Sequence, residues 1–247
     1  MSDRIALVTG GGTGIGRAAA LALNGLGFTV AVCGRRKEPL DEVIAAMGGK
    51  GLAFVCDVTR PHEVRHMFSV LKETYGRLDF LFNNAGMSGP PALLEDLPFE
   101  AWQSVVNINL TAVFLCTQEA FKIMKAQSPM GGRIINNGSI SAHTPRPNTI
   151  AYTATKHGVT GITKTSALDG RKYNIAVGQI DIGNAESQMA DKMKKGMPQA
   201  DGSIKPEATM KLDHVGQAIS MMANLPLDSN VLNLTIKATL MPFEGRG

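Results

Sequence analysis

Two kinds of apolar pattern alternate along the chain. Segments that are apolar throughout predict buried strands, and segments whose apolar residues recur every three or four positions predict helices with one buried face. Strands are expected at residues 4–9, 28–34, 51–58, 78–84, 132–139, 174–180 and 231–236. Helices are expected at residues 15–26, 38–47, 61–76, 99–127 and 215–224, and around the sequence YTATK that begins at Tyr152.

This alternation predicts the α/β fold class. Strands that are apolar on both faces and joined by helices form a parallel sheet covered on both sides, and right-handed crossovers make it doubly wound. We expect a Rossmann-type, mainly parallel sheet of about seven strands with helices on both faces. No linker or break in composition divides the chain, so residues 1–247 are predicted to form a single domain. Residues 184–211, rich in Met, Lys and Gly, interrupt the alternation and are predicted to be a lid over the edge of the sheet.

The charge pattern argues against two classes of partner. The chain carries 25 Lys and Arg against 21 Asp and Glu, and the excess is scattered rather than gathered in a block. Nucleic acid is therefore not expected as a partner. No run approaches the roughly 20 apolar residues of a membrane span, and the start MSDRIALVTG carries charges where a signal peptide is apolar. We expect a cytoplasmic protein without membrane association.

Cysteine and histidine spacings predict no metal site. The cysteines, none in a CxxC pair, are Cys33, Cys56 and Cys116. They fall in apolar segments and are expected to be free, buried thiols in a reducing compartment. His62, His143 and His157 have no metal-ligating partner at useful spacing. We interpret these as surface or helix-flank residues.

A glycine-rich turn follows the first predicted strand. In TGGGTGIG, Thr9 to Gly16, Gly10 lets the chain leave the strand sharply and Gly14 lets the backbone approach a pyrophosphate. Gly16 allows close packing of the next helix, whose N-terminus favours negative charge. The strand-turn-helix context favours nucleotide binding over a merely flexible turn.

The spacing G-x-x-x-G-x-G in this turn resembles that of the short-chain dehydrogenase/reductase family. The resemblance covers nearly the whole chain, because NNAG at 83–86 resembles the motif that closes the family's fourth strand. Four residues match the family's catalytic quartet in order and spacing, namely Asn109, Ser139, Tyr152 and Lys156. The family's cofactor-binding residues correspond to Gly10, Gly12, Thr13, Gly14, Ile15, Gly16, Arg35, Arg36, Asp57, Val58, Asn84, Ala85, Gly86, Tyr152, Lys156 and Ile182. The resemblance implies an oxidoreductase that transfers hydride between a nicotinamide dinucleotide and a carbonyl or secondary alcohol.

The end of the second strand indicates which dinucleotide binds. A carboxylate there would hold a ribose 2′-hydroxyl, but VCGRR offers Arg35 and Arg36 instead. Guanidinium groups pair with a 2′-phosphate, so NADP(H) is the expected cofactor, with NAD(H) as the alternative. Asp57 resembles the residue that meets the adenine amino group, although it can also simply cap the next turn.

Tyr152 and Lys156 are four residues apart on a predicted helix, so their side chains meet on one face. A free phenol has a pKa of about 10, and a neighbouring cation is expected to lower it toward the range of a general acid. Ser139 is expected to hydrogen-bond the substrate oxygen, with Ser141 as a competing hydroxyl. The family resemblance implies that Lys156 also holds the nicotinamide ribose.

Asn109 lies on the apolar face of the long predicted helix, where a buried amide needs hydrogen-bond partners. The family resemblance implies that it holds a water in a proton relay from Lys156. Neighbouring backbone groups can satisfy the amide equally well, and both interpretations can hold together.

Two departures from the family bear on the substrate. Ile182 stands where a proline usually precedes Gly183. The lid segment carries methionines and lysines, namely Met189, Met193, Met197, Lys192, Lys194 and Lys195. Methionines at this spacing are either core or an adaptable apolar wall. A wall with a cationic rim suits a greasy carbonyl substrate with an acidic handle, such as an acyl chain on a carrier protein.

Three functions are weighed on this basis. The first is an NADP(H)-dependent carbonyl reductase, of which a 3-oxoacyl-[acyl-carrier-protein] reductase is one form. The second is a sugar, polyol or steroid dehydrogenase, and the third is a nucleotide-sensing protein without catalysis. The intact catalytic residues count against a sensor. Small residues on the YTATK helix, such as Ala154, Gly158 and Gly161, and the family resemblance predict a homotetramer or homodimer.

Overall fold

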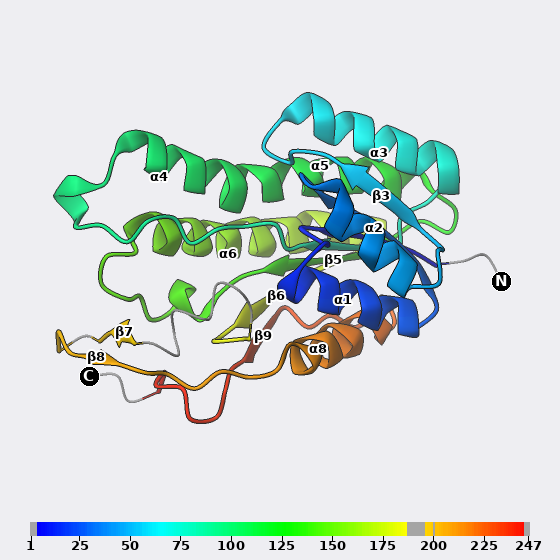
Figure 1. Cartoon of the computed structure of the whole chain (residues 1–247). Helices are drawn as coiled ribbons and strands as arrows, with labels where there is room; N and C mark the ends of the chain where they lie inside the picture. The colour runs from blue at the N-terminus through cyan, green and yellow to red at the C-terminus, as the bar shows by residue number, and fades with distance from the viewer. Residues whose placement is uncertain (1–3, 187–195, 200, 245–247) are drawn as a thin grey trace.

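Seven parallel strands form the central sheet, in the order β3-β2-β1-β4-β5-β6-β9 (Figure 1). The computed structural model describes residues 4–186, 196–199 and 201–244 of the chain. The strands are β1 Arg4–Thr9, β2 Phe28–Gly34, β3 Leu52–Val55, β4 Phe80–Asn83, β5 Gly132–Asn137, β6 Ile175–Ile182 and β9 Asn233–Ile236. A separate antiparallel pair consists of β7 Met197–Pro198 and β8 Ile204–Lys205. The α/β class and the mainly parallel sheet predicted from the sequence are confirmed.

Helices cover both faces of this sheet and bury the inner strands β1, β2, β4, β5 and β6 along most of their length. One hydrophobic core lies between the sheet and α1, α2 and α8, and a second lies between the sheet and α3 and α5. Helices α4 and α6 lie on the same side as α5 (Figure 1). The helices are α1 Gly14–Gly25, α2 Lys37–Ala46, α3 Pro61–Tyr75, α4 Phe99–Val106, α5 Ala112–Ala126, α6 Ile150–Gly170 and α8 Leu212–Asn224.

The strand order reverses between β1 and β4, which are hydrogen-bonded neighbours. From β1 the chain proceeds to β2 and β3 on one side, and from β4 to β5, β6 and β9 on the other. The connections that leave β1 and β4 therefore diverge at the carboxyl ends of these strands. Open α/β sheets bind ligands at such a point.

Several element boundaries differ from the sequence prediction. The helix expected at 99–127 is α4 and α5 joined through a π-helical segment, Asn107–Thr111. Helix α2 runs from Lys37 to Ala46, one residue earlier at each end than predicted. Strand β6 continues to Ile182 because it pairs with β9 up to Ile236. Helix α3 begins at Pro61, as predicted, and ends at Tyr75, with Gly76 as its C-cap.

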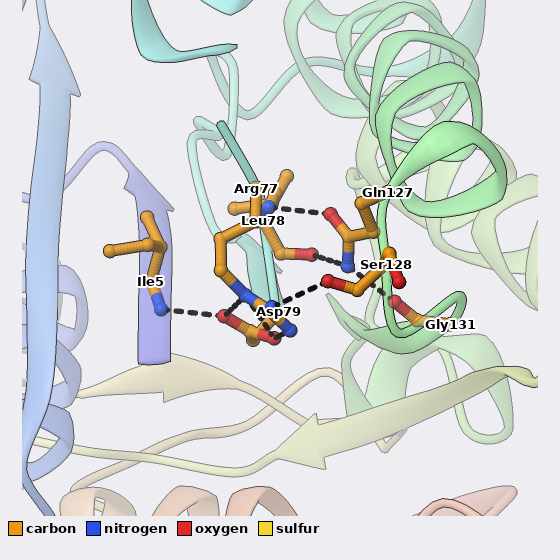
Figure 2. Close-up of polar contacts among 7 residues, drawn as sticks. All are labelled: Ile5, Arg77, Leu78, Asp79, Gln127, Ser128 and Gly131. Atoms are coloured by element: carbon orange, nitrogen blue, oxygen red, sulfur yellow. Dashed lines mark hydrogen bonds and ion pairs between the residues drawn. The ribbon is translucent and has the colours of Figure 1, made fainter. Parts of the chain in front are cut away.

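A polar network ties the amino end of the sheet together (Figure 2). Asp79, just before β4, accepts hydrogen bonds from the amide of Ile5 at 2.8 Å and from Nε of Arg77 at 2.9 Å. The side chain of Gln127, just after α5, accepts from the amide of Leu78 at 2.8 Å and donates to the Gly131 carbonyl at 2.7 Å. The network therefore links the starts of β1 and β4 to the end of α5.

None of the helices in the described ranges is both long and apolar enough to span a membrane.

Candidate active site

The glycine-rich turn joins β1 to α1 at the centre of the sheet. Gly10 and Gly14 have φ values of 63° and 52°, in the left-handed region that favours glycine. A Cβ on Gly16 would lie 2.1 Å from the carbonyl oxygen of Gly10, so only glycine permits this approach. The side chain of Thr13 does not cap α1, and no acidic residue occupies its first turn. The N-terminal amides of α1 are therefore suited to an anionic group such as pyrophosphate.

Hydrogen bonds connect this turn to α6. Asn84 Nδ2 donates to the carbonyl oxygens of Thr9 at 3.0 Å and Gly10 at 3.2 Å. Asn84 Oδ1 accepts from Asn137 Nδ2 at 2.9 Å. The carbonyl oxygen of Asn137 accepts from Lys156 Nζ at 2.7 Å. The structure thus brings the predicted phosphate turn and the predicted catalytic lysine into one network.

Other predicted cofactor residues lie along the same edge. Ala85 donates its amide to Thr9 Oγ1 at 3.0 Å. Gly86 is exposed, and a Cβ there would lie 3.0 Å from Asn109 Oδ1. Gly12 lies against Pro39, whereas Ile15 packs against the core.

Arg35 and Arg36 are exposed between β2 and α2, where the sequence predicts a 2′-phosphate site. Asp57 accepts hydrogen bonds from the amide and hydroxyl of Thr59 at 3.0 and 2.7 Å, so it does cap a turn. Burial alone would raise the pKa of Asp57, but the Thr59 hydrogen bonds and the charge of Arg35 hold it below its ordinary value. The side chain of Val58 lies in the core, so only its backbone can face a ligand.

Tyr152 and Lys156 share one face of α6, as predicted. Lys156 Nζ lies 5.4 Å from the centre of the Tyr152 ring. Ser139, just past the end of β5, is buried, and its side chain lowers the pKa of the Tyr152 phenol in part. Ser139 Oγ also accepts from the amide of Ser141 at 3.1 Å. Of the two candidate hydroxyls, Ser139 is the one that affects the pKa of the phenol.

The pKa of Tyr152 shows that one expectation was wrong. Burial raises this pKa above its ordinary value, the Ser139 side chain lowers it in part, and the charge of Asp181 raises it again. Burial of the phenol is the largest of these effects and outweighs the lowering expected from Lys156. Burial also lowers the pKa of Lys156 itself, to about 8. The ammonium hydrogen-bonds the Asn137 carbonyl, 2.7 Å away.

Asn109 lies in the π-helical segment and is buried. Its Oδ1 accepts from the amide of Met87 at 2.9 Å, and its Nδ2 donates to the Met87 carbonyl at 2.9 Å and to Thr155 Oγ1 at 3.2 Å. Neighbouring groups therefore satisfy the hydrogen-bonding capacity of the Asn109 side chain. This agrees with the simpler of the two interpretations, in which nearby groups rather than a relay water bind the amide. The hydrogen bond to Thr155, the residue directly before Lys156, places Asn109 against α6.

Two residues of this edge were missed by sequence reasoning. Asp181 lies in β6, is fully buried, and accepts a hydrogen bond from the amide of Ser139 at 2.9 Å. His143 Nε2 lies 2.7 Å from the other carboxylate oxygen of Asp181, so this histidine is more than a helix-flank residue. The available signal was a charged residue inside an apolar strand, directly before the departure at Ile182.

Ile182 does not line the edge through its side chain, which lies in the hydrophobic core. The residues that follow contact the segment after β5. The Arg146 guanidinium pairs with the buried Glu207 carboxylate, which also accepts from Asn184 Nδ2 at 2.7 Å and Gln199 Nε2 at 3.0 Å. Burial alone would raise the pKa of Glu207, but these hydrogen bonds lower it to about 2.

Part of the predicted lid lies outside the described residues. This applies to Met189, Met193, Lys192, Lys194 and Lys195. Met197 begins β7 and is half-buried. The three cysteines are free and buried, as predicted. In the part of the chain that the structure describes, no three His, Cys, Asp or Glu side chains gather as metal ligands would.

Comparison with known proteins agrees with this geometry. Residues 4–198 match the family model described as short chain dehydrogenase. A 3beta-hydroxysteroid dehydrogenase from Mediterraneibacter gnavus is 37% identical over 193 residues, which cover 77% of this chain and 69% of that protein. A 3-oxoacyl-[acyl-carrier-protein] reductase from Synechocystis is 36% identical over 197 residues, 78% of each chain. The crystal structure of an actinorhodin polyketide ketoreductase with NADPH superposes with a TM-score of 0.86 at 27% identity, covering 96% of this chain and 97% of that one.

The glycine-rich turn, Ser139, Tyr152 and Lys156 lie at the carboxyl edge of the sheet, where open α/β sheets bind their ligands. The chain belongs to the short-chain dehydrogenase/reductase family. It is an oxidoreductase of this family, and the prediction made from its motifs is confirmed.

Proposed function

We propose that the protein is an NADP(H)-dependent reductase of ketones. The observation that carries this proposal is the position of Tyr152, whose ring centre lies 5.4 Å from Lys156 Nζ on the same face of α6 and whose pKa the neighbouring Ser139 lowers in part. When bound, the nicotinamide supplies the hydride. Ser139 and Tyr152 hold the carbonyl oxygen, and Tyr152 gives its proton to the alkoxide that forms.

Lys156 has two roles in this proposal. Its ammonium, fixed on the Asn137 carbonyl, lies beside the phenol and favours the phenolate left after proton transfer. It is also available to the ribose hydroxyls at the same edge. Asn109, bonded to Met87 and Thr155, holds the segment after β4 against α6 and so keeps Lys156 in place.

The cofactor proposal depends on the turn and on the two arginines. The turn from Gly10 to Gly16 fits a dinucleotide, because its glycines carry no side chains beside the N-terminus of α1, which no side chain caps. Arg35 and Arg36 offer exposed guanidinium groups and the loop holds no competing acid, which supports NADP(H) over NAD(H). The ketoreductase of similar fold was crystallised with NADPH.

The substrate class is proposed from the relatives. The two similar proteins described above are named for a 3-hydroxysteroid and for a 3-oxoacyl group on a carrier protein. We therefore infer an apolar ketone substrate, with a 3-oxoacyl thioester as first candidate and a ketosteroid as second. Residues 184–211 are proposed to cover this substrate, and the Arg146–Glu207 pair attaches the segment to the loop after β5. A sensor without catalysis has no need of this arrangement of Ser139, Tyr152 and Lys156.

We propose that the protein is a homotetramer or homodimer and that it is cytoplasmic. The outer faces of α5 and α6 form a groove that contains Phe114, Phe121 and Ile162, and the Phe114 side chain is 50% exposed. Exposed apolar groups of this kind favour contact with a second copy of the chain. Sedimentation analysis of the Phe114→Glu variant is expected to show dissociation, whereas an unchanged mass would place the contact elsewhere.

The central test is NADPH oxidation followed by absorbance with a panel of ketones, repeated with NADH. The Tyr152→Phe variant is expected to lose about 10²–10⁴-fold in turnover, the usual contribution of a general acid, while it binds NADPH normally. The matched control is Tyr75→Phe, a phenol outside the site, which is expected to retain full turnover. Retained turnover in Tyr152→Phe would contradict the assignment.

A further inference from the structure

Hydrogen bonds hold Ser139 in the turn that follows β5. Its carbonyl oxygen accepts from the Ala142 amide at 2.9 Å, and its Oγ accepts from the Ser141 amide at 3.1 Å. Its own amide donates to Oδ1 of Asp181 at 2.9 Å. The first two bonds lie within the turn, whereas the third fixes Ser139 to β6. Because Oγ already accepts from an amide, its hydroxyl hydrogen is the part suited to a substrate oxygen.

The Asp181 carboxylate is a buried acceptor for this amide. Asp181 is fully buried in β6, and its Oδ1 accepts from Gln179 Nε2 at 2.7 Å as well as from the Ser139 amide. Since both partners of Oδ1 are N–H donors, this oxygen is an acceptor in every protonation state of the contact between Oδ2 and His143. The bond to Ser139 therefore depends on an acceptor oxygen rather than on a net charge.

The same carboxylate contacts the other end of the turn. Its Oδ2 lies 2.7 Å from Nε2 of His143 and 2.8 Å from Nδ2 of Asn233 in β9. Ser139 is the residue before the 3-10 helix Ile140–Ala142, and His143 is the residue after it. One side chain of β6 thus contacts both ends of the segment that carries the Ser139 hydroxyl.

Gly138 leaves room for the carboxylate beside Ser139. A Cβ at position 138 would lie 2.0 Å from Asp181 Oδ1 and 2.6 Å from Gln179 Nε2. The Gly138 amide donates to the Ile180 carbonyl at 2.9 Å, so the strands stay paired up to this residue. The atoms nearest to an added Cβ belong to side chains. Gly138→Ala is therefore expected to displace the carboxylate from the Ser139 amide.

We propose that Asp181 is a positioning residue, whose carboxylate holds the turn from Ser139 to His143 and so places the Ser139 hydroxyl to donate to the carbonyl oxygen of the substrate. The inference rests on the proposed function, in which Ser139 binds that oxygen. Asp181 acts through Ser139 and has no contact with the substrate. A donor aimed at a developing oxyanion loses its effect when it is displaced, and a displacement of about 1 Å costs about 10²-fold in rate.

The test compares two substitutions of Asp181 in NADPH-dependent ketone reduction at pH 7. Asp181→Leu has a similar shape and no acceptor, so kcat is expected to fall about 30–100-fold, the cost of a displaced donor. Asp181→Asn keeps an oxygen for the Ser139 amide, so its kcat is expected to stay within about threefold of the wild type. The KM for NADPH is expected to change less than about threefold in both variants, because the cofactor turn follows another strand. An equal loss of kcat in both variants would overturn the proposal.

A double-mutant cycle separates positioning from general damage to the fold. Ser139→Ala removes the donor itself and is expected to lower kcat about 10²–10³-fold. In that background Asp181→Leu is expected to cause less than about twofold further loss, since no hydroxyl is left to position. The same loss in both backgrounds would overturn the proposal and leave the role of Ser139 intact. Unchanged turnover in Ser139→Ala alone would refute the proposed function, and the inference with it.

Two further variants make the test independent of whether Asp181→Leu folds. Gly138→Ala reaches the same contact from the end of β5 and is expected to give a similar loss of kcat, again suppressed in the Ser139→Ala background. The matched control is Asn233→Ala, which removes an exposed partner of Oδ2 and leaves Oδ1 unchanged, so its kcat is expected to stay within about twofold of the wild type. Wild-type kcat in Gly138→Ala, or an equal loss in Asn233→Ala, would overturn the proposal.

Hydrogen exchange of the Ser139 amide, measured by NMR, tests the contact without turnover. Exchange in Asp181→Leu is expected to be at least about tenfold faster than in the wild type, whereas Asp181→Asn is expected to stay within about threefold. Faster exchange in Asp181→Leu alone supports the hold of Asp181 on Ser139 even if no ketone is reduced. Equal rates in the wild type and both variants would overturn it.

Discussion

The two ends of the central sheet both hold polar side chains that are at least partly buried, yet they use them in opposite ways. At the amino end, Asp79 joins Arg77 and the start of β1, and the hydrogen bond to Asp79 raises the pKa of Arg77 (Figure 2). At the carboxyl end, Lys156 hydrogen-bonds a neutral carbonyl, and burial lowers its pKa to about 8. An ion pair stabilises the charged form in the first case, and burial without a direct ion pair destabilises it in the second.

This difference separates groups that support the fold from groups that carry chemistry. The folded-state pKa of Lys156 lies below the ordinary value of 10.5, so the unfolded chain binds its proton more tightly. The burial of Lys156 therefore opposes folding at pH 7, and this penalty disappears as the pH rises from about 8 towards 10.5. Function, rather than stability, explains why a lysine occupies this position.

The largest expected effect comes from removing the charge at the carboxyl end. Lys156→Met is expected to lower kcat/KM by about 10³-fold or more, since proton transfer and ribose binding both use the ammonium. The free energy of unfolding at pH 7 is expected to rise by about 1–2 kcal/mol, because a desolvated charge is removed. Steady-state kinetics and urea unfolding measure the two effects. Lys164→Met, an exposed lysine of the same helix, is the control, and a stability loss in Lys156→Met would contradict the comparison.

The amino end should respond in the reverse manner. Asp79→Ala leaves the Arg77 guanidinium and the Ile5 amide without their partner, so the free energy of unfolding is expected to fall by about 3 kcal/mol. At the same time kcat/KM is expected to stay within about twofold, because the site lies at the other end of the strands. Asp41→Ala, which removes an exposed ion pair with Lys37, should cost less than about 0.5 kcal/mol. A large loss of turnover in folded Asp79→Ala would show that the two ends are coupled.

Exposed charges near the carboxyl end test ligand binding without touching the fold. Arg35→Ser/Arg36→Ser is expected to raise the KM for NADPH about 10–100-fold, the loss of one or two charge-assisted hydrogen bonds. The KM for NADH should change less than about threefold, because it lacks the 2′-phosphate. Lys37→Ser, an adjacent exposed cation, controls for net charge. Equal loss with both cofactors would reject the NADP(H) preference.

The Arg146–Glu207 pair gives the smallest expected effect, because the isosteric change Glu207→Gln retains part of the hydrogen bonding. Its free energy of unfolding at pH 7 is expected to be about 1–2 kcal/mol lower than that of the wild type. The pKa of Glu207 is lowered from 4.5 to about 2, so the contribution of its charge is present above pH 4.5 and is lost as the pH falls toward 2. Urea unfolding at several pH values should show wild type and variant converging in acid. A difference that persists at pH 2 would assign the effect to packing.

Local motifs explain why much of the fold and site could be predicted. The spacing of apolar residues in strands and helices indicates which faces are buried. The turn from Gly10 to Gly16 requires glycine because of backbone angles and close approaches that arise within the turn itself. Tyr152 and Lys156 are close in sequence, so the helical period alone places them together. Ser139 is separated from Tyr152 by thirteen positions, and its assignment depended on the family resemblance.

Contacts between distant segments could not be predicted in this way. Asp181, His143 and Asn233 meet only because β6 lies between β5 and β9. The π-helical segment around Asn109 and the continuation of β6 through Ile182 depend on tertiary packing and strand pairing rather than on local preference.

The sequence by itself determined the strand and helix order, the phosphate turn and the pair on α6, because each follows from periodicity or steric limits within a few residues. Only the tertiary structure decided the electrostatics of the site. Burial and the charge of Asp181 set the proton affinity of Tyr152, and both depend on which segments surround it. Electrostatic energies depend on the distances between all charges and on their exposure to water, and neither quantity can be read from a linear chain.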